Sequence, residues 1–337
     1  MSEPLLSVKG LDVRLGKRHL GHRGGPRTIL SGVDFEIAPG EIVGVIGETG
    51  SGKTTLARTI LGTLRPAAGS IRFEARDLVG LSKSELRDFR RTGALQLILQ
   101  DPLRSLDPDF TVEEIVGEGL SLRGHRRSTQ VHERVEATLA LVGLDPELAS
   151  RRPGEISGGQ RQRVSIARSL IVEPKLLICD EPVSALDAST RNYLLSIFAQ
   201  VRAELGVALL VISHDLSSLA GLADRIAVLF QGRIVEDGPL DEVFNRPRHP
   251  YTGLLLASAP EISRGWSSFG GSRAALRRPA LQVLEDEQGG CAYAARCPFA
   301  DAACRVSPPH LLEAGSGHHV ACVHESTWQE SLVGAGR

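Results

Sequence analysis

The stretch GETGSGKT, residues 47–54, decides the fold class of this chain. It fits the pattern G-x-x-x-x-G-K-[ST] and lies between the β-branched run EIVGVIG and the helical pattern TTLARTILGTL. Glycines let backbone N–H groups face a phosphate, and the N-terminus of the following helix adds positive potential. Lys53 can reach the terminal phosphates of a nucleotide, and the Thr54 hydroxyl can bind Mg²⁺. The expected loop residues are Gly47, Glu48, Thr49, Gly50, Ser51, Gly52, Lys53, Thr54 and Thr55.

Outward from this loop, short apolar runs alternate with helical patterns, which is typical of an α/β fold with a parallel sheet. We expect buried strands at residues 93–100, 175–180, 207–213 and 225–230. Between about residues 101 and 165 the pattern is helical, so we expect a helical insertion there. A long helix is expected at about 190–205.

Two acidic residues stand at the end of the second of these strands, in the run LLICDE, residues 176–181. A buried strand that ends in Asp180 brings a carboxylate to the sheet edge where the phosphates are expected, which is a usual place for an Mg²⁺ ligand. Glu181 would face the γ-phosphate as a general base or as the group that orients the attacking water. Taken alone, a strand-end aspartate is as often a helix cap.

A second anion-binding helix N-terminus is expected at ISGGQRQRVSIARSL, residues 156–170. Its first residues are Ser157, Gly158, Gly159 and Gln160. By itself the stretch also fits an ordinary serine N-cap.

In this order along the chain, the motifs resemble those of the nucleotide-binding subunit of an ABC transporter. ISGGQ resembles the signature of that family, with Ile156 where leucine is usual. Gln100 is similar to the Q-loop glutamine, SALD at 184–187 to the D-loop, and His214 to the switch histidine. The resemblance implies that Glu181, His214 and Gln100 organise ATP hydrolysis and that Asp187 belongs to the nucleotide site. It also implies that Gln100 joins Thr54 and Asp180 as an Mg²⁺ ligand.

QDPLRSLDP, CDEPVSALD and RHPYTGLLLASAP resemble the ATPases of oligopeptide and dipeptide importers, a subfamily in which some members move nickel. The likeness runs from Leu5 to Cys322. It implies an ATP-hydrolysing subunit at the cytoplasmic face of the membrane, bound peripherally to membrane-spanning permease subunits. It further implies a second, non-identical ATPase and, indirectly, a solute-binding protein. Because the signature helix lies in the helical insertion, each ATP is expected between residues 47–54 of one chain and 157–160 of another.

One position departs from the family. An aromatic residue normally follows the first strand and stacks on adenine, whereas Leu15 aligns there and no aromatic residue precedes Phe35. Imidazole or guanidinium groups can also cover a base, so His19, His22 or Arg27 are candidates for this role.

Four of the five cysteines lie near the end of the chain: Cys291, Cys297, Cys304 and Cys322. Four thiolates can bind an iron–sulfur cluster or Zn²⁺, or they can remain without metal. The stretch resembles the C-terminal extension of peptide-importer ATPases, some of which carry [4Fe-4S], so we expect that cluster, with Zn²⁺ as the alternative. The stretch has few apolar residues, and a metal would supply folding energy. Cys179 lies in an apolar strand and is expected to act as a small core residue.

We therefore expect a P-loop nucleotide-binding domain at 1–262, followed at 263–337 by a Gly/Ser-rich linker and a Cys-rich extension. A formal net charge of −1 gives no field for nucleic acid. The N-terminal residues have no signal-peptide pattern and no apolar run is long enough to span a bilayer, so a cytosolic chain is expected. The rival functions are a soluble ABC ATPase of the repair or translation type, and a metal-sensing regulator, for which no DNA-binding motif is present.

Overall fold

The computed structural model describes residues 3–16, 26–99, 106–124, 129–183, 187–259, 289–315 and 317–329. Several residues singled out by the sequence lie outside these ranges. They are His19, His22, Gln100 and residues 184–186, together with the Gly/Ser-rich stretch 263–273.

An eight-stranded sheet forms the centre of the molecule, in the order β11-β12-β10-β9-β3-β8-β7-β6. The five strands β9, β3, β8, β7 and β6 run parallel to one another, as expected from their continuous apolar runs, whereas β10 is antiparallel to β9. The strands are β3 (Ile42–Ile46), β6 (Leu95–Ile98), β7 (Leu176–Asp180), β8 (Ala208–Ser213), β9 (Arg225–Phe230), β10 (Arg233–Pro239), β11 (Leu312–Glu313) and β12 (His319–Val320).

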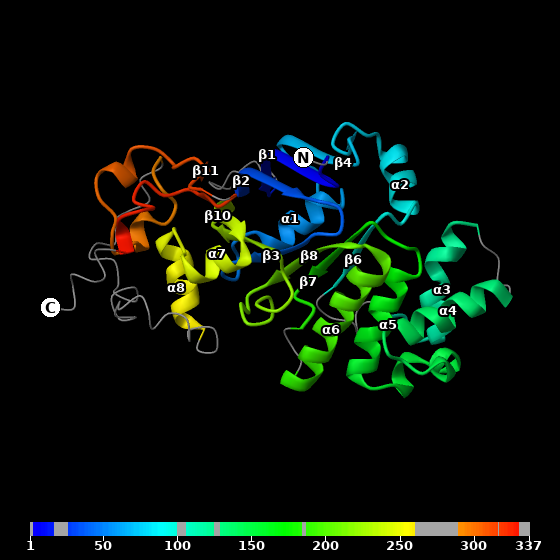
Figure 1. Cartoon of the computed structure of the whole chain (residues 1–337). Helices are drawn as coiled ribbons and strands as arrows, with labels where there is room; N and C mark the ends of the chain where they lie inside the picture. Colours follow the sequence, from blue (N-terminus) through cyan, green and yellow to red (C-terminus); the bar gives the residue numbers. More distant parts are fainter. Residues whose placement is uncertain are drawn as a thin grey trace.

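A second, antiparallel sheet has the order β2-β1-β4-β5 and was not predicted from the sequence. Its strands are β1 (Leu6–Leu15), β2 (Arg27–Ile37), β4 (Ala68–Phe73) and β5 (Arg76–Asp77). The apolar face of helix α1 (Lys53–Ile60) shares a buried cluster with this sheet and with one face of the central sheet. The helix that follows the loop 47–54 is therefore fixed from both sides (Figure 1).

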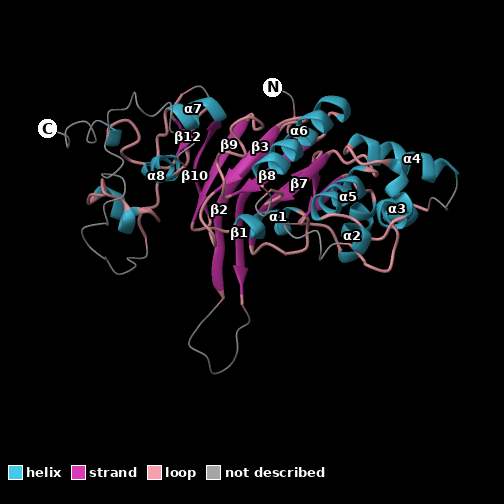
Figure 2. Cartoon of the chain, turned by 90° about the horizontal axis from the view of Figure 1, so that it is seen from below, coloured by secondary structure: helices cyan, strands magenta, loops and turns pink. Residues whose placement is uncertain are grey.

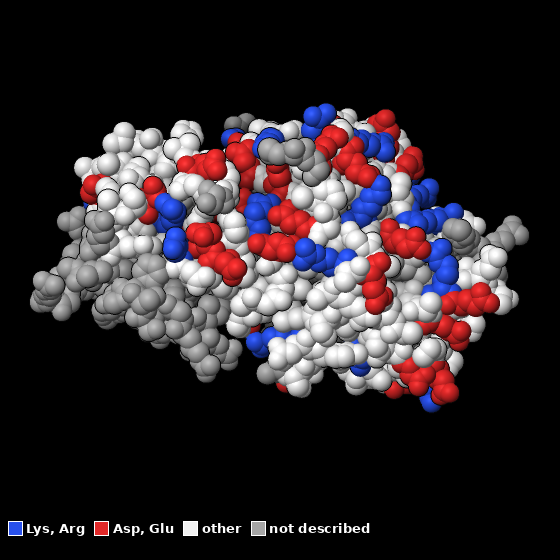
Figure 3. Space-filling view, viewed as in Figure 1, with Lys and Arg blue, Asp and Glu red and all other residues white. Residues whose placement is uncertain are grey.

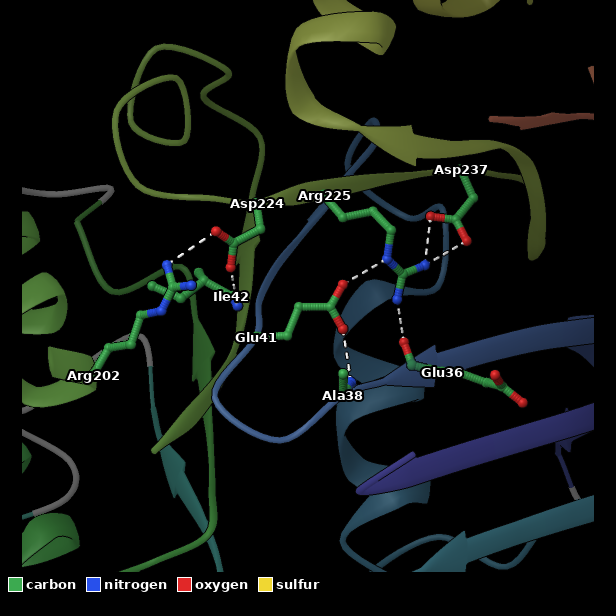
Figure 4. Close-up of polar contacts among 8 residues, drawn as sticks. All are labelled: Glu36, Ala38, Glu41, Ile42, Arg202, Asp224, Arg225 and Asp237. Atoms are coloured by element: carbon green, nitrogen blue, oxygen red, sulfur yellow. Dashed lines mark hydrogen bonds and ion pairs between the residues drawn. The ribbon is translucent and has the colours of Figure 1, made fainter. Parts of the chain in front are cut away.

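An ion network around Arg225 joins the two sheets (Figure 4). The guanidinium donates to Glu41 at 2.8 Å, to both carboxylate oxygens of Asp237 at 2.8 and 2.6 Å, and to the backbone carbonyl of Glu36 at the end of β2. Arg225 is the first residue of β9. The network therefore lies at the amino end of β9, whereas Gln231 follows the carboxyl end.

Helices cover the other face of the sheet and extend to one end of the molecule (Figures 1 and 2). They include the helical insertion that the sequence predicts, and Val135 and Leu139 are fully buried in it. These helices are α3 (Val112–Leu122), α4 (Thr129–Leu141), α5 (Gly158–Leu170) and α6 (Ala188–Leu205), with short 3₁₀ turns η2 (Pro146–Ser150) and η3 (Pro153–Glu155). Helix α2 (Lys83–Arg91) lies instead beside the antiparallel sheet, where Phe89 packs against Phe73 of β4.

The C-terminal part of the chain lies at the opposite end, beside α7 (Leu240–Asn245) and α8 (Pro250–Ser258) (Figures 1 and 2). We call residues 289–329 the cysteine tail; it contains η5 (Ala294–Arg296), η6 (Ala303–Arg305), β11 and β12. Strand β12 pairs with β10, and Tyr293 and Trp328 are buried in the main apolar cluster. The preceding part of the chain thus supplies much of the core around the tail.

On the face shown in Figure 3, lysine and arginine are interspersed with aspartate and glutamate. No helix within the described ranges has the length and apolar character that a membrane crossing requires.

Candidate functional site

The carboxyl ends of the parallel strands bring four chain segments to one edge of the central sheet. The loop 47–55, called the phosphate loop below, follows β3, which lies between β8 and β9. Glu181 follows β7, His214 follows β8 and Gln231 follows β9. This edge is where α/β sheets usually bind ligands.

Two glycines of the phosphate loop are required by close contacts and by the backbone conformation. A Cβ atom on Gly47 would lie 2.1 Å from the carbonyl oxygen of Leu229, and one on Gly52 would lie 2.7 Å from the Leu30 side chain. Gly52 also has a φ of 110°, which is strained for any other residue, directly before α1. The loop conformation therefore depends on glycine at both positions.

A cavity of about 800 Å³ opens at the phosphate loop. The predicted residues that line it are Thr49, Gly50, Gly52, Lys53, Thr54, Thr55, Glu181 and His214. Arg27, considered for base stacking, also lines it. Thr28, Ile29 and Gln231 line it too and were missed by the sequence analysis, although the Gln-Gly turn after a buried strand was a usable signal. No aromatic side chain lines the described part of this cavity.

Lys53 is buried among backbone carbonyls and acidic groups. Its Nζ atom donates to the carbonyl oxygens of Gly47 at 2.7 Å and Glu48 at 3.0 Å. Burial lowers the pKa of Lys53, while the carboxylates of Glu181, Asp180 and Glu48 act in the opposite direction. The ammonium group thus stands close to where an anionic ligand would contact the loop.

Thr54 and Asp180 meet directly, as two ligands of one metal ion must. The Thr54 hydroxyl donates to Asp180 Oδ1 at 3.3 Å, and the Asp180 side chain is buried. Burial raises the pKa of Asp180, and the Thr54 hydrogen bond acts against this shift. A hydroxyl and a carboxylate oxygen are the donor set that Mg²⁺ prefers, so these residues fit that ion.

Glu181 and His214 form a second polar pair. Glu181 Oε1 lies 3.2 Å from His214 Nδ1. The Glu181 backbone has a φ of 51°, a conformation that costs a non-glycine residue of order 1–3 kcal/mol. Its N–H donates to the carbonyl of Ile212 at 2.9 Å, in the neighbouring strand, which holds this conformation. Strain of this kind often accompanies functional positions.

Ser157 and Gln160 form a capping box at the start of α5. The Ser157 hydroxyl accepts from the Gln160 N–H at 3.2 Å, and Gln160 Oε1 accepts from the Ser157 N–H at 2.8 Å. Gly158 and Gly159 complete the first turn, and all four residues are at least partly exposed. Among the described residues that line the cavity at the phosphate loop, none comes from α5.

Asp187 caps α6. Its carboxylate accepts from the hydroxyls of Ser189 at 2.6 Å and Thr190 at 2.8 Å, and from both of their backbone N–H groups. These hydrogen bonds, with the Ser189 hydroxyl first, hold the pKa of Asp187 well below its usual range. Asp187 does not line the cavity within the described part of the chain.

The four tail cysteines line one small pocket although they are spread along the sequence. Cys291, Cys297, Cys304 and Cys322 face it together with His249 and His324. Burial raises the pKa of Cys297 and Cys322 to about 12, while the backbone N–H groups of Phe299 and His324 act to lower these values. Within the described ranges, one group of three potential ligand atoms lies mutually within 4.8 Å: Asp301, Cys304 and His324.

Comparison with known proteins identifies the family of the chain. Residues 30–184 match the ABC transporter family, and residues 235–304 match the family described as Oligopeptide/dipeptide transporter, C-terminal region. A putative peptide import ATP-binding protein of Brucella ovis is 40% identical over 323 residues, which cover 96% of this chain and 98% of that protein. The oligopeptide transport ATP-binding protein OppF of Salmonella typhimurium is 39% identical over 322 residues, 93% of this chain and 92% of that protein.

Solved structures show the same fold. The structure of cbiO1 from Clostridium perfringens, part of an ABC transporter complex, matches with a TM-score of 0.65 at 25% identity, over 79% of this chain and 99% of that chain. The ATP-binding cassette MJ0796, in a dimeric post-hydrolysis state bound to ADP and Pi, matches with a TM-score of 0.62 at 26% identity, over 70% of this chain and 98% of that chain. Together with the full-length relatives, these matches show that the chain is an ATPase of the ABC transporter family and has the α/β cassette fold that its sequence predicts.

Proposed function

We propose that this chain is the ATP-hydrolysing subunit of a peptide importer and acts at the cytoplasmic face of the membrane, bound to membrane-spanning permease subunits. The observation that carries the proposal is the convergence of the phosphate loop, Asp180, Glu181 and His214 at one sheet edge, in a chain whose full-length relatives are named for peptide import. The relatives favour this function over a soluble repair or translation ATPase. Residues 1–262 would form the nucleotide-binding domain and 263–337 the linker and extension.

Each polar group of the cavity has a role that fits its position. The backbone N–H groups of residues 47–55 and the Lys53 ammonium would bind the phosphates of ATP. Thr54 and Asp180, with Gln100, would hold Mg²⁺, which supplies positive charge against the phosphate oxygens. Glu181 would accept a proton from the attacking water, and His214, 3.2 Å from it, would keep that carboxylate oriented.

The signature residues 157–160 and Asp187 would complete the site of a second ATPase subunit. They do not line the cavity of their own chain within the described residues, and the solved cassette MJ0796 is a dimer. Closing on ATP would bring the exposed N-terminus of α5 toward the phosphates of the partner. As in the importers that the sequence resembles, the partner would be a non-identical ATPase, and a solute-binding protein would act from the other side of the membrane.

For the cysteine tail we propose a [4Fe-4S] cluster held by Cys291, Cys297, Cys304 and Cys322. All four thiols share one pocket, which supports a common ligand. A single tetrahedral Zn²⁺ would need its sulfur ligands about 3.8 Å apart. No three of these sulfurs lie mutually within 4.8 Å in the described structure, which favours the wider spacing of a cluster. Zn²⁺ bound by Asp301, Cys304 and His324 is the alternative.

The transport proposal is tested by purifying the chain with its neighbouring subunits and measuring peptide-stimulated ATP hydrolysis in proteoliposomes. We expect integral membrane subunits and a second ATPase in the complex, and uptake that Lys53→Ala abolishes. A chain that copurifies with ribosomes or DNA-repair proteins, and with no membrane subunit, would contradict the proposal.

The cluster proposal is tested by metal analysis and visible absorption of protein purified without oxygen. We expect about four irons per chain and their loss on Cys297→Ser. Cys179→Ala is the matched control, because Cys179 is buried in β7. Protein that contains one zinc and no iron, and loses it on Cys304→Ser but not on Cys297→Ser, would support the alternative site. Metal content that neither variant changes would exclude both sites.

A further inference from the structure

The cysteine tail contacts the phosphate loop at the acidic residue Glu48. The Arg296 guanidinium donates two hydrogen bonds to the Glu48 carboxylate, to Oε2 and to Oε1, each at 2.7 Å. The backbone N–H of Glu48 donates to the Tyr251 hydroxyl at 2.9 Å. Side chain and backbone of one loop residue are therefore both held by the C-terminal part of the chain.

Arg296 is itself held in place by aromatic rings. Its guanidinium lies 5.5 Å from the ring centre of Phe230 and 5.7 Å from that of Tyr293. A planar guanidinium that stacks on rings and binds a carboxylate with two parallel hydrogen bonds has little freedom left to lose. A lysine offers neither the planar stack nor the paired donors, so it would replace Arg296 only in part.

Arg296 also stands directly beside the thiol pocket. It ends η5 and is followed by Cys297, while Cys291 lies just before this turn. The backbone N–H of Ala294 donates to the Cys291 carbonyl at 3.0 Å, and that of Cys297 to the Ala294 carbonyl at 3.3 Å. The turn that carries the guanidinium is thus hydrogen-bonded to the backbone of both cysteines.

The Glu48 carboxylate lies near the Lys53 ammonium, and this explains why its ion pair with Arg296 matters. The Lys53 ammonium already touches the Glu48 carbonyl at 3.0 Å, and the carboxylate of Glu48 interacts with it electrostatically. Arg296 is the first cause of the lowered pKa of Glu48, so this carboxylate is a paired anion. Released from Arg296, it would be a negative charge free to pair with Lys53 and to repel a polyphosphate.

We propose that Arg296 is a positioning residue for nucleotide binding: it keeps the Glu48 carboxylate away from Lys53, and it couples the phosphate loop to the thiol pocket of the cysteine tail. The inference rests on the proposed role of Lys53 in binding ATP. Energetic coupling between two sites is reciprocal, so nucleotide at the loop must also change the thiol pocket.

The first test measures the affinity of the full-length chain for MgATP by calorimetry. We expect Arg296→Ala to weaken binding about 5- to 10-fold and Arg296→Lys to weaken it less. The decisive variant is the double change Arg296→Ala with Glu48→Gln, which removes the competing charge and should restore most of the affinity. A merely structural role of Arg296 predicts no such rescue. Arg305→Ala is the matched control, since Arg305 also adjoins a tail cysteine and makes no ion pair among the described residues.

The outcomes separate this inference from the proposed function. If Arg296→Ala binds MgATP as tightly as the unmodified chain and Lys53→Ala does not bind it, the inference about Arg296 is wrong. The proposed nucleotide site is then still supported. Failure of the unmodified chain to bind MgATP overturns the proposed site instead.

The second test follows the thiols. In chelator-treated, full-length protein, we expect MgATP to change the rate at which N-ethylmaleimide labels Cys291 and Cys297, measured by mass spectrometry, and we expect this effect to vanish in Arg296→Ala. Labelling that ignores MgATP in the unmodified chain, or that responds equally in the variant, would show that the two sites are not coupled through Arg296.

Discussion

Glu181 and His214 face each other across the ends of the neighbouring strands β7 and β8, with Glu181 Oε1 3.2 Å from His214 Nδ1. The histidine side chain is half exposed, whereas the glutamate is largely buried and lies on a left-handed backbone. This arrangement fixes the carboxylate while it leaves the imidazole accessible to a ligand that arrives from outside. The first prediction follows from this difference.

Glu181→Gln should bind MgATP with normal affinity and hydrolyse it about 10²- to 10⁴-fold more slowly, because the amide cannot accept the proton of the attacking water. Equilibrium binding and single-turnover phosphate release measure the two effects separately. Glu173→Gln is the matched control, since Glu173 also has a φ of 51° and lies outside the cavity lining. Hydrolysis at the normal rate in Glu181→Gln would remove Glu181 from the catalytic role.

The protein should discriminate poorly between adenine and guanine nucleotides. No aromatic side chain lines the described cavity, and base stacking on aromatic rings is worth roughly 1–3 kcal/mol per base. We expect the dissociation constants for MgATP and MgGTP to differ by less than about tenfold, and we expect Arg27→Ala to weaken both. A strong ATP preference that disappears on changing His19, His22 or Arg27 would instead identify the group that covers adenine.

His249 should make the stability of the protein depend on pH. It is buried at the start of α8, where its Nδ1 accepts from the Tyr251 N–H at 3.1 Å, and burial lowers its pKa to about 3. Since the unfolded chain binds the proton near pH 6.5, stability is lost as the pH falls below about 6.5 and the loss continues toward pH 3. At pH 5 this amounts to about 2 kcal/mol.

His249→Asn keeps a capping oxygen but has no titrating group. Urea unfolding at pH 7.5 and pH 5 should therefore show that the variant loses about 2 kcal/mol less stability than the unmodified chain over this interval. Equal losses in the two proteins would mean that His249 is not the group that titrates.

Glu236 should be the strongest polar anchor of the cysteine tail. It is fully buried, accepts from the N–H groups of Arg248 at 2.6 Å and His249 at 3.0 Å, and lies 2.7 Å from Nε2 of the tail residue His318. Glu236→Leu leaves these groups without a partner and should cost about 3–5 kcal/mol, with Glu236→Gln intermediate.

Denaturant unfolding, followed by the fluorescence of the buried Trp328, measures this loss. Glu313→Leu, an exposed change in β11, should alter stability by less than about 0.5 kcal/mol. If Glu236→Leu and Glu313→Leu have similar free energies of unfolding, Glu236 does not anchor the cysteine tail.

The parts of the fold that the sequence predicts are those with an uninterrupted local pattern. Strands β7 and β8 are buried throughout, so their apolar runs were unmistakable. In β1 the buried residues Val8, Leu11 and Val13 are spaced unevenly because the register shifts between them, which hides the alternation of a half-buried strand. This spacing hides β1 from a search for a regular alternation.

The site shows the same division. Lys53 and Thr54 belong to one continuous motif and could be assigned from spacing alone. The pairing of Arg296 with Glu48 joins positions 248 residues apart and depends on how the tail packs, for which no local pattern exists. Likewise, Gln231 reaches the cavity only because β9 lies beside β3 in the sheet order.

The pairing of β12 with β10 also bears on how the protein is made. During synthesis the ribosome delivers β10 well before β12, so the newly folded cassette has an open strand edge until the last residues emerge. Unpaired edges recruit strands from other molecules, and charged residues such as Glu236 and Asp237, together with Pro239 at the end of the strand, discourage such pairing. A chain that stops before residue 289 would keep this edge of β10 open, so its resistance to aggregation at this edge would depend on these residues without the cover of β12.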